Sequence, residues 1–332
     1  MEKTFAIITP ILYEHTYINY FIEYHLKLGF DKIYFLIDNF TCEQDEYIIN
    51  NQSLVDKVKF YYTKDLVSRE EQLQYVNHEK THIVHRALQN VYKYVIEDYT
   101  ILLGVDSFLY LDNLTIKEFF DKYNLIKLDV SQIMFKWIVL VNFDYKSNYS
   151  LLKDIHDKQN IHKMYNPTYF TLGNRHKVNH PSSDSHHYVI KNENDTIWCN
   201  NEIYKINNTH NFYNIVDMME NNRVRIGCIY HFMARDMLDV IIKTYYYWNK
   251  SSKVLKESIL KFISTNSNNF SDRFSYFYMG TDNHLIINKV TLNVDNENQT
   301  YNNDKLINKF LIDNNLSVEQ LLECANKRGF KI

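Results

Sequence analysis

The residue of this sequence best placed to do chemistry is Asp106, a single carboxylate within the apolar run ILLGVDSFLYL at 101–111. Such a run is typical of a strand buried on both faces, as in a parallel sheet covered by helices. A carboxylate inside that strand would cost free energy unless something paired with it. We therefore expect the strand to end near Gly104 and Asp106 to lie at the carboxyl edge of the sheet, where open α/β sheets bind ligands. The alternative is an aspartate that merely caps a core strand.

Histidines form a second group of chemically useful residues. His78, His82, His85 and Arg86 fall on one face of a helix predicted at 77–94, because their spacing is i, i+4, i+7 and i+8. A further set lies in the loosely patterned stretch 144–222, at 156, 162, 176, 180, 186, 187 and 210. Loops of this kind often carry active-site residues.

The elements that must position these residues alternate between strands and helices. Strands are predicted at 5–8, 32–37, 58–62, 101–104, 131–141 and 224–232, and helices at 18–28, 77–94, 115–123 and 234–247. Gly29 suits the C-terminal end of the first helix, and Asp112 or Asn113 suits the start of the third. The first strand, helix and strand have the length of a right-handed βαβ unit. The pattern predicts an α/β fold with a mostly parallel central sheet flanked by helices.

Composition narrows the class of protein. The 332 residues are 45% hydrophobic and 23% charged, which is typical of a globular chain. A net charge of -3 and the lack of any Lys/Arg cluster argue against nucleic-acid binding. The four cysteines are scattered, and no apolar run is long enough for a signal or a membrane span, so we expect a cytoplasmic protein. Abundant Tyr, Asn, Ile and Lys indicate an AT-rich genome, such as that of a giant virus, a protist or a low-GC bacterium. If the source is viral, the host cytoplasm is expected.

Three segments together resemble the family-2-like glycosyltransferases, and more closely the branch grouped with family 92. Where that branch has Lys-Asn-Glu-x-x-Tyr-Leu-x-Glu-Trp-x-x-Tyr-His-x-x-x-Gly, this chain has Glu14, Tyr17, Ile18, Phe21, Tyr24, His25, Leu28 and Gly29. VDSFL at 105–109 stands where the branch has Val-Asp-Glu-Phe-Leu, and Trp137 fits the tryptophan that follows. IYHF at 229–232, with Arg235, Asp236 and Lys243, resembles Ile-x-His-Tyr-x-x-Lys-Ser and a later Lys. The likeness covers roughly residues 4–250.

Two departures from the family pattern fall beside Asp106. Gly104 replaces the first Asp of the Asp-x-Asp motif and Ser107 replaces the Glu after it, so one carboxylate remains of three. Leu12-Tyr13 also replaces the Lys-Asn that precedes the family's Glu.

The resemblance implies a GT-A-like catalytic domain at 1–250, with a donor half at 1–140 and an acceptor-side half at 141–250. A mainly helical extension would follow at 251–332. The donor would be a nucleotide-sugar, expected to be a UDP-sugar, and the acceptor a hydroxyl of a glycan, protein or lipid. The transfer is expected to invert the anomeric centre in one displacement. Mn²⁺ or Mg²⁺ would bind to Asp106 and His231, since such ions need few protein carboxylates besides phosphate and water. A structural histidine at a strand end is the alternative for His231.

The remaining site residues are predicted from the resemblance together with their places in the chain. Donor binding is predicted for Asp106 itself and for six further residues: Thr9, Glu14, Asp38, Arg86, Arg235 and Lys243. The Asp38 carboxylate would accept from uracil N3–H, and the cations would face the diphosphate. Each has a structural alternative: a turn aspartate, a helix-start glutamate or a solvated helix face. Asp184, Glu202 and Asp236 are candidates for the base that deprotonates the acceptor, and the sites predicted are Asp184, whose loop contains His186 and His187, and Asp236. A helix-start acid is the alternative for Asp236.

Two other functions compete with the active enzyme. Gly104 and Ser107 favour a degenerate glycosyltransferase-like protein that binds sugar or nucleotide without turnover. A structural or partner-binding α/β protein would bind no nucleotide. The sugar, the acceptor and the oligomeric state do not follow from the sequence.

Overall fold

The computed structural model describes residues 2–37 except 13 and 16, 49, 51–71 except 69, 80–141, 162–205 except 183–186 and 193–194, 226–232, 323, 326 and 327. The chain divides into two compact units, Met1–Val139 with Tyr165–His231, and Leu140–Met164 with Phe232–Ile332. Apart from a few strand ends, the elements below belong to the first unit. The predicted domain boundary at 250 and almost all of the predicted helical extension lie outside the described residues, so both stay predictions.

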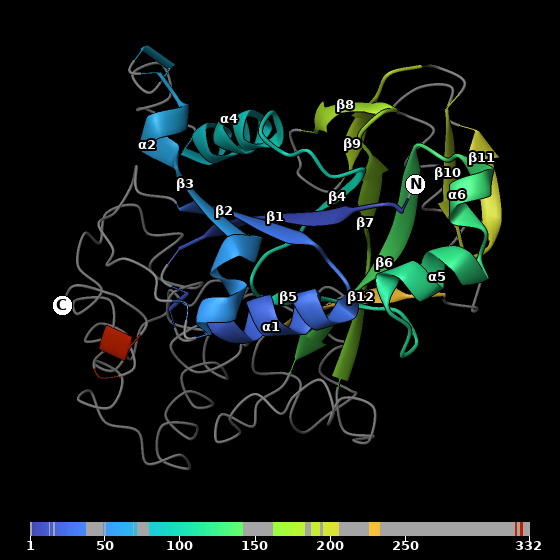
Figure 1. The fold of residues 1–332 in the computed structure, drawn as a ribbon, viewed down its shortest axis with the longest axis horizontal. Helices are drawn as coiled ribbons and strands as arrows, with labels where there is room; N and C mark the ends of the chain where they lie inside the picture. Colours follow the sequence, from blue (N-terminus) through green and yellow to red (C-terminus); the bar gives the residue numbers. More distant parts are fainter. Residues whose placement is uncertain are drawn as a thin grey trace, which may run out of the picture. The chain divides into compact units, whose positions relative to one another are not determined.

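The central element is a mixed sheet in the order β11-β10-β6-β7-β4-β1-β2-β3 (Figure 1). Its strands are β1 (Phe5–Ile11), β2 (Lys32–Ile37), β3 (Val58–Tyr62), β4 (Tyr99–Leu102), β6 (Gln132–Val141), β7 (His162–Asn174), β10 (Thr196–Cys199) and β11 (Glu202–Lys205). The four strands β3, β2, β1 and β4 are parallel, whereas β7 runs antiparallel to β4. Off this path, β5 (Ser107–Tyr110) pairs antiparallel with β12 (Cys228–Phe232), which also pairs with β6. Strands β8 (Val178–Pro181) and β9 (Tyr188–Ile190) form a separate pair. The predicted α/β fold with a mostly parallel central sheet is confirmed.

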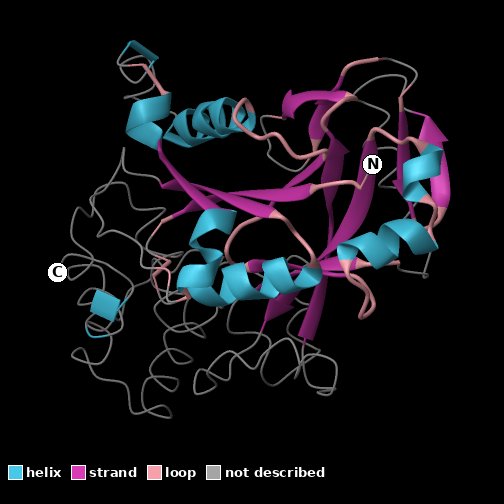
Figure 2. Cartoon of the chain, in the orientation of Figure 1, coloured by secondary structure: helices cyan, strands magenta, loops and turns pink. Residues whose placement is uncertain are grey.

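Helices cover both faces of the parallel strands (Figure 2). They are α1 (Ile18–Leu28), α2 (Thr63–Leu66), α4 (Lys80–Tyr92), α5 (Ile116–Lys122) and α6 (Leu125–Leu128), with a 3₁₀ helix at Gln52–Lys57. On one face, Phe35 of β2 meets Phe21 of α1 and Phe5 of β1 meets Phe120 of α5, with ring centroids 6.2 and 4.7 Å apart. The alternate residues of the same strands face α4. This two-sided burial explains why the strands are apolar along their whole length.

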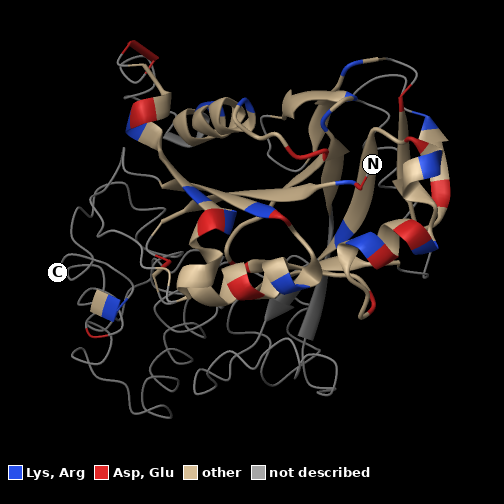
Figure 3. Ribbon diagram, viewed as in Figure 1, with Lys and Arg blue, Asp and Glu red and all other residues tan. Residues whose placement is uncertain are grey.

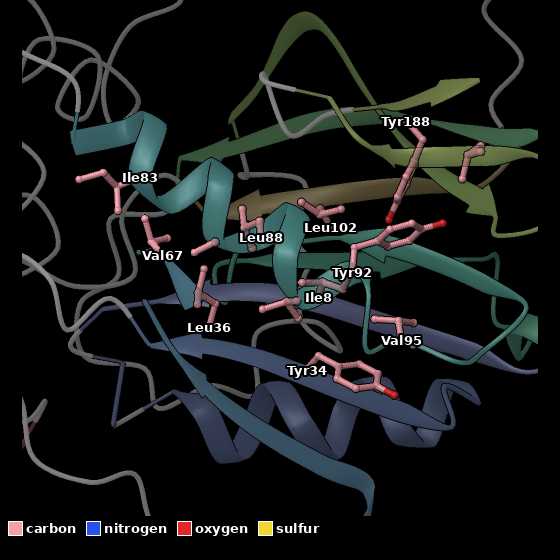
Figure 4. Close-up of a cluster of buried hydrophobic side chains, with 14 residues drawn as sticks. Ile8, Tyr34, Leu36, Val67, Ile83, Leu88, Tyr92, Val95, Leu102 and Tyr188 are labelled. Carbon is pink, nitrogen blue, oxygen red and sulfur yellow. The ribbon is translucent and has the colours of Figure 1, made fainter. Parts of the chain in front are cut away.

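The face toward α4 holds a continuous apolar cluster (Figure 4). Its buried members come from β1, β2, β4, β8, β9 and α4 and from the segments between them: Ala6, Ile8, Tyr34, Leu36, Val67, Ile83, Ala87, Leu88, Val91, Tyr92, Val95, Leu102, Val178 and Tyr188. The cluster packs α4 against the three parallel strands β1, β2 and β4.

The ends of two helices follow from local chemistry. Gly29 ends α1 with φ 105°, a left-handed conformation that favours glycine, as predicted. Thr115, and not the predicted Asp112 or Asn113, caps α5: its side chain accepts from the Glu118 amide while Glu118 bonds back to Thr115. Asp112 and Asn113 instead adopt positive φ in the preceding turn.

Strand boundaries differ from the sequence prediction in three places. β1 runs on to Ile11 through Pro10, because β4 pairs with β1 only as far as Ile8 and the missing N–H of proline is tolerated beyond it. The run 101–111 is two strands, β4 and β5, with different neighbours. The stretch expected to hold short strands and loops contains the 13-residue strand β7.

Most charged residues of the described part of the chain are at least partly exposed, although Glu97 and Asp195 are buried. Helix α5 carries two basic and two acidic residues, Lys117, Glu118, Asp121 and Lys122 (Figure 3). Among the described residues, no helix is long and apolar enough to cross a membrane.

Asp98 ties three chain segments together at the start of β4. Its carboxylate accepts from the Thr4 amide (3.0 Å), the Thr4 hydroxyl (3.1 Å) and Lys3 (3.0 Å), and it contacts His176 at 3.3 Å. Burial acts to raise the pKa of Asp98, but the bonds from Thr4, Lys3 and His176 outweigh it and lower the pKa to about 2. The ionised form therefore stabilises the pairing of β1 with β4.

We expect Asp98→Asn to lower the free energy of unfolding by about 1–2 kcal/mol at pH 7, the range for charge-assisted bonds near solvent. A depressed folded-state pKa gives stability that is present above pH 4 and lost as pH falls toward 2. The difference between wild type and variant should therefore shrink over that window in urea unfolding at several pH values. The matched control is Asp129→Asn, whose carboxylate is 70% exposed and pairs with Lys177. An equal effect of both variants would contradict the role of Asp98.

Candidate functional site

A tight turn joins β4 to β5 and carries Asp106. The Leu103 amide still bonds to Ile8 of β1 (3.1 Å), and the Ser107 amide then closes the turn on Gly104 (2.9 Å). Asp106 thus follows the carboxyl end of β4, the sheet edge at which the sequence placed it. Its side chain is 16% exposed.

His231 meets this turn from a distant part of the chain. β12 pairs with β5 so that His231 stands opposite Ser107. Its Nδ1 lies 2.9 Å from Ser107 Oγ and 3.3 Å from Asp106 Oδ1, and the Ser107 hydroxyl donates to Asp106 Oδ1 at 3.4 Å. The two residues predicted to bind a metal are therefore neighbours, with Ser107 between them.

These three side chains do not form a nucleophilic triad. In such a triad the carboxylate holds one imidazole nitrogen and the serine hydroxyl contacts the other. Here Asp106 and Ser107 both contact Nδ1. Ser107 is also 2% exposed, so a substrate would have little access to its oxygen.

Gly104 leaves room for the carboxylate of Asp106. A Cβ at position 104 would lie 2.5 Å from Asp106 Oδ1, well inside van der Waals contact. Any other residue there would require Asp106 to rotate away from its present position. Of the two residues that depart from the motif this segment resembles, Gly104 leaves space for the Asp106 carboxylate and Ser107 hydrogen-bonds to it.

Trp137 of β6 fixes the ring of His231. The two ring centroids are 4.6 Å apart at an interplanar angle of 52°, and Trp137 in turn meets Phe170 of β7 edge-on at 5.6 Å. His231 is therefore held both in the ring plane, by Ser107 and Asp106, and against one ring face.

Side chains of α1 hold β5, the strand after Asp106, by hydrogen bonds to its backbone. The Tyr24 hydroxyl donates to the Leu109 carbonyl (2.8 Å), and the Leu109 amide donates to His25 Nε2 (3.5 Å). His25 Nδ1 donates to the Phe21 carbonyl (3.0 Å), and its ring stacks on Phe108. Burial lowers the pKa of His25 to about 3, although the bond to Phe21 opposes the shift, so the ring stays neutral. The Tyr-His pair of the first motif is therefore structural and places β5.

Asp106 and His231, the predicted metal ligands, have side chains of the types that bind divalent cations, and they lie next to each other. A carboxylate has two oxygens, so one can bond to Ser107 while the other meets a cation. No group of three or more His, Cys, Asp or Glu side chains gathers within the described part of the chain. Two protein ligands fit a hard ion that takes its remaining ligands from phosphate and water, and fit a closed structural metal site poorly.

The other predicted site residues divide into two groups. Thr9 is fully buried within β1. Glu14 lies between β1 and α1, where its carbonyl accepts from the amides of Tyr17 and Ile18; it precedes the helix start, so it is neither the N-cap nor a first-turn acid. Arg86 of α4 forms an ion pair with Glu71, which precedes the helix, and the two charged groups are 3.1 Å apart near the surface.

The second group lies outside the described residues: Asp38, Asp184, Arg235, Asp236 and Lys243. The roles given to both groups stay predictions.

Sequence reasoning missed what Ser107, Tyr24 and His25 do. Ser107 counted only as a lost carboxylate, and the Tyr-His pair only as part of a motif. Neither the sequence of β5 nor that of β12 alone predicts the pairing that puts Ser107 opposite His231. One signal was available for His25: it falls at helical spacing with Ile18, Phe21 and Ile22, which indicates a buried position.

Comparisons with known proteins give a limited result. No protein-family model matches the chain, and no curated protein matches it. Among solved structures, it is similar to glucosyl-3-phosphoglycerate synthase from Mycobacterium tuberculosis in complex with Mn²⁺, UDP-glucose and phosphoglyceric acid, at 15% identity and a TM-score of 0.24, over 41% of this chain and 44% of that one. A structure described as a mycobacterial protein has 9% identity and a TM-score of 0.29, over 70% and 65% of the two chains. The chain thus spans less than half of the first structure, and likenesses of this size support no statement about activity.

The neutral state of His25 has a measurable consequence for stability. Because its folded-state pKa lies below the usual value of 6.5, the unfolded chain binds the proton first and stability falls as pH drops from 6.5 toward 3. Each pH unit in that window should cost up to about 1.4 kcal/mol from this residue. We expect His25→Gln to lower stability at pH 7 by about 1–3 kcal/mol, and to show a shallower loss on acidification.

The measurement is urea unfolding between pH 7 and pH 4, with Asp129→Asn as the control because the Asp129 carboxylate is 70% exposed. Parallel pH profiles for wild type and His25→Gln would refute the assignment of a neutral buried imidazole.

Proposed function

We propose that this chain is a glycosyltransferase that moves a sugar from a nucleotide-sugar donor to a hydroxyl acceptor with the help of Mn²⁺ or Mg²⁺. The proposed donor is a UDP-sugar, and the proposed transfer is inverting. The narrower likeness to family 92 stays a prediction. So do cytoplasmic localisation and the glycan, protein or lipid nature of the acceptor.

One observation carries the proposal. Asp106 and His231, singled out as metal ligands from two separate motifs, lie 3.3 Å apart beside the carboxyl end of β4. The pairing of β12 with β5 produces this proximity, although neither motif contains information about the other. An aspartate that merely capped a strand would not need a histidine beside it.

The departures from the family motif support an intact site more than a decayed one. Gly104 provides the space that Asp106 occupies, and Ser107 bonds to both predicted ligands. One replacement leaves space for the remaining carboxylate and the other hydrogen-bonds to it, which random loss of acidic residues would not be expected to produce. His231 corresponds to a histidine of the family pattern itself, so one predicted ligand from each of the two motifs is present.

Each group has a proposed task. A bound divalent ion would neutralise the charge that develops on the leaving diphosphate. Asp106 and His231 would hold that ion, and Asp184 or Asp236 would take the proton from the acceptor hydroxyl. Thr9, Glu14, Asp38, Arg86, Arg235 and Lys243 are proposed to bind the donor.

A second candidate is a protein that binds nucleotide or sugar without turnover. It is favoured by the presence of only two protein ligands, because fewer carboxylates hold a cation less tightly. Binding and turnover therefore have to be measured separately.

The proposal is tested first by thermal melting with UDP, with and without Mn²⁺. A ligand at about 100 times its dissociation constant stabilises a fold by roughly 2.7 kcal/mol. We expect a metal-dependent rise in wild type that is lost in Asp106→Ala and in His231→Ala and kept in the surface control Asp129→Asn. UDP release from a panel of UDP-sugars then measures turnover.

Three outcomes discriminate among the candidates. No response to any nucleotide would contradict both proposals and favour a structural or partner-binding protein. A rise that survives Asp106→Ala would place the nucleotide elsewhere. A normal rise without UDP release from any donor would favour binding without turnover.

Gly104→Ala tests the geometry without removing a ligand. The new Cβ would displace the Asp106 carboxylate from Ser107 and His231. We expect the affinity for Mn²⁺ and UDP together to fall by about tenfold, as when a group that orients a metal ligand is lost. Calorimetric titration of wild type and variant, both checked for folding by circular dichroism, gives the comparison. Unchanged affinity would mean that the present position of Asp106 is irrelevant to binding.

A further inference from the structure

We propose that Ser107 is a positioning residue that fixes the tautomer of His231. In this arrangement Nδ1–H donates to Ser107 Oγ, and the Ser107 hydroxyl donates to Asp106 Oδ1. The Nε2 nitrogen of the neutral ring then keeps its lone pair for a ligand. The use of that lone pair to bind the cation rests on the proposed function, whereas the tautomer itself does not.

The distances decide where the proton lies. Nδ1 is 3.3 Å from a carboxylate oxygen of Asp106 as well as 2.9 Å from Ser107 Oγ. An ionised carboxylate can only accept. If Nδ1 carried a lone pair, it would face that of Asp106 Oδ1, and the contact would be repulsive. A proton on Nδ1 makes both contacts favourable.

The Ser107 hydroxyl completes a chain of hydrogen bonds in which each group donates to the next, from His231 to Ser107 to Asp106. A hydroxyl has one proton to donate, and the Ser107 hydroxyl donates it to Asp106 Oδ1. Its oxygen is then the acceptor for Nδ1–H. Within the described residues His231 Nε2 has no hydrogen-bond partner. Histidines that bind metals commonly donate their other N–H to such a group, which sets tautomer and ring orientation.

Neighbouring residues hold the side chains of Ser107, His231 and Asp106 in their relative positions. Ser107 is buried and stands opposite His231 in the β5–β12 pair. Trp137 packs against the His231 ring, and Gly104 admits the Asp106 carboxylate. A glutamate at 107, as in the family pattern, could accept from Nδ1–H but could not donate to Asp106. The serine is therefore a specific partner for a site with one carboxylate.

The test is the ¹⁵N spectrum of the full chain labelled at histidine, recorded at pH 8, with His231→Gln to assign the His231 signals. We expect wild type to show Nδ1 protonated and Nε2 unprotonated. Ser107→Ala should bring in a measurable Nε2–H population, and Ser107→Thr should keep the wild-type pattern. Ser131→Ala is the matched control, because Ser131 is also buried and donates to the Thr196 carbonyl at 2.8 Å. It should leave the His231 signals unchanged.

A wild-type ring protonated on Nε2, or on both nitrogens, would overturn the inference, and so would an unchanged tautomer in Ser107→Ala. Mn²⁺–UDP binding adds the readout that depends on function. We expect about tenfold weaker binding in Ser107→Ala and near-wild-type binding in Ser107→Thr. If the tautomer responds as expected but wild type binds no Mn²⁺–UDP, the hydrogen-bonded chain stands and the proposed function fails.

Discussion

A carboxylate at the end of a strand buried on both faces has to be bonded by neighbours, and the site depends on how Asp106 meets this requirement. The Ser107 hydroxyl and His231 both contact its Oδ1. To bring His231 there, β12 must pair with β5 in one register. A shift of that pairing by one residue would turn the His231 side chain to the other face and leave the carboxylate without it.

The strand that carries Ser107 is itself placed by α1. Tyr24 and His25 bond to the carbonyl and the amide of Leu109, so the backbone of β5 is satisfied by side chains. This explains why a buried histidine persists in an apolar helix face although burial disfavours its charged form. The helix also packs on β2 through Phe21 and Phe35. One helix therefore joins the parallel sheet to the β5–β12 pair.

The replaced motif residues have a consistent physical explanation. In a cluster of three carboxylates, repulsion between like charges must be offset by a cation. With Gly104 and Ser107, the remaining carboxylate is held by a hydroxyl and an imidazole, and it can be ordered before any cation binds. If the proposed cation binds here, such a site would give up some affinity for the ion in exchange for a defined geometry.

The amino-acid sequence alone determined the local structure. Apolar runs, and alternation in β3, predicted the strands β1, β2, β3, β4 and β6 and a mostly parallel sheet, and Gly29 marked the end of α1. These features depend on burial and backbone conformation within a short segment. The sequence also placed Asp106 at a strand end. The tertiary structure alone decided that the run 101–111 divides into two strands and that Ser107 stands opposite His231. It also gave the Tyr-His pair of α1 the task of binding Leu109. The physical reason is that strand register and side-chain bonds between distant segments depend on which partners the whole fold brings together, and no segment encodes its partner.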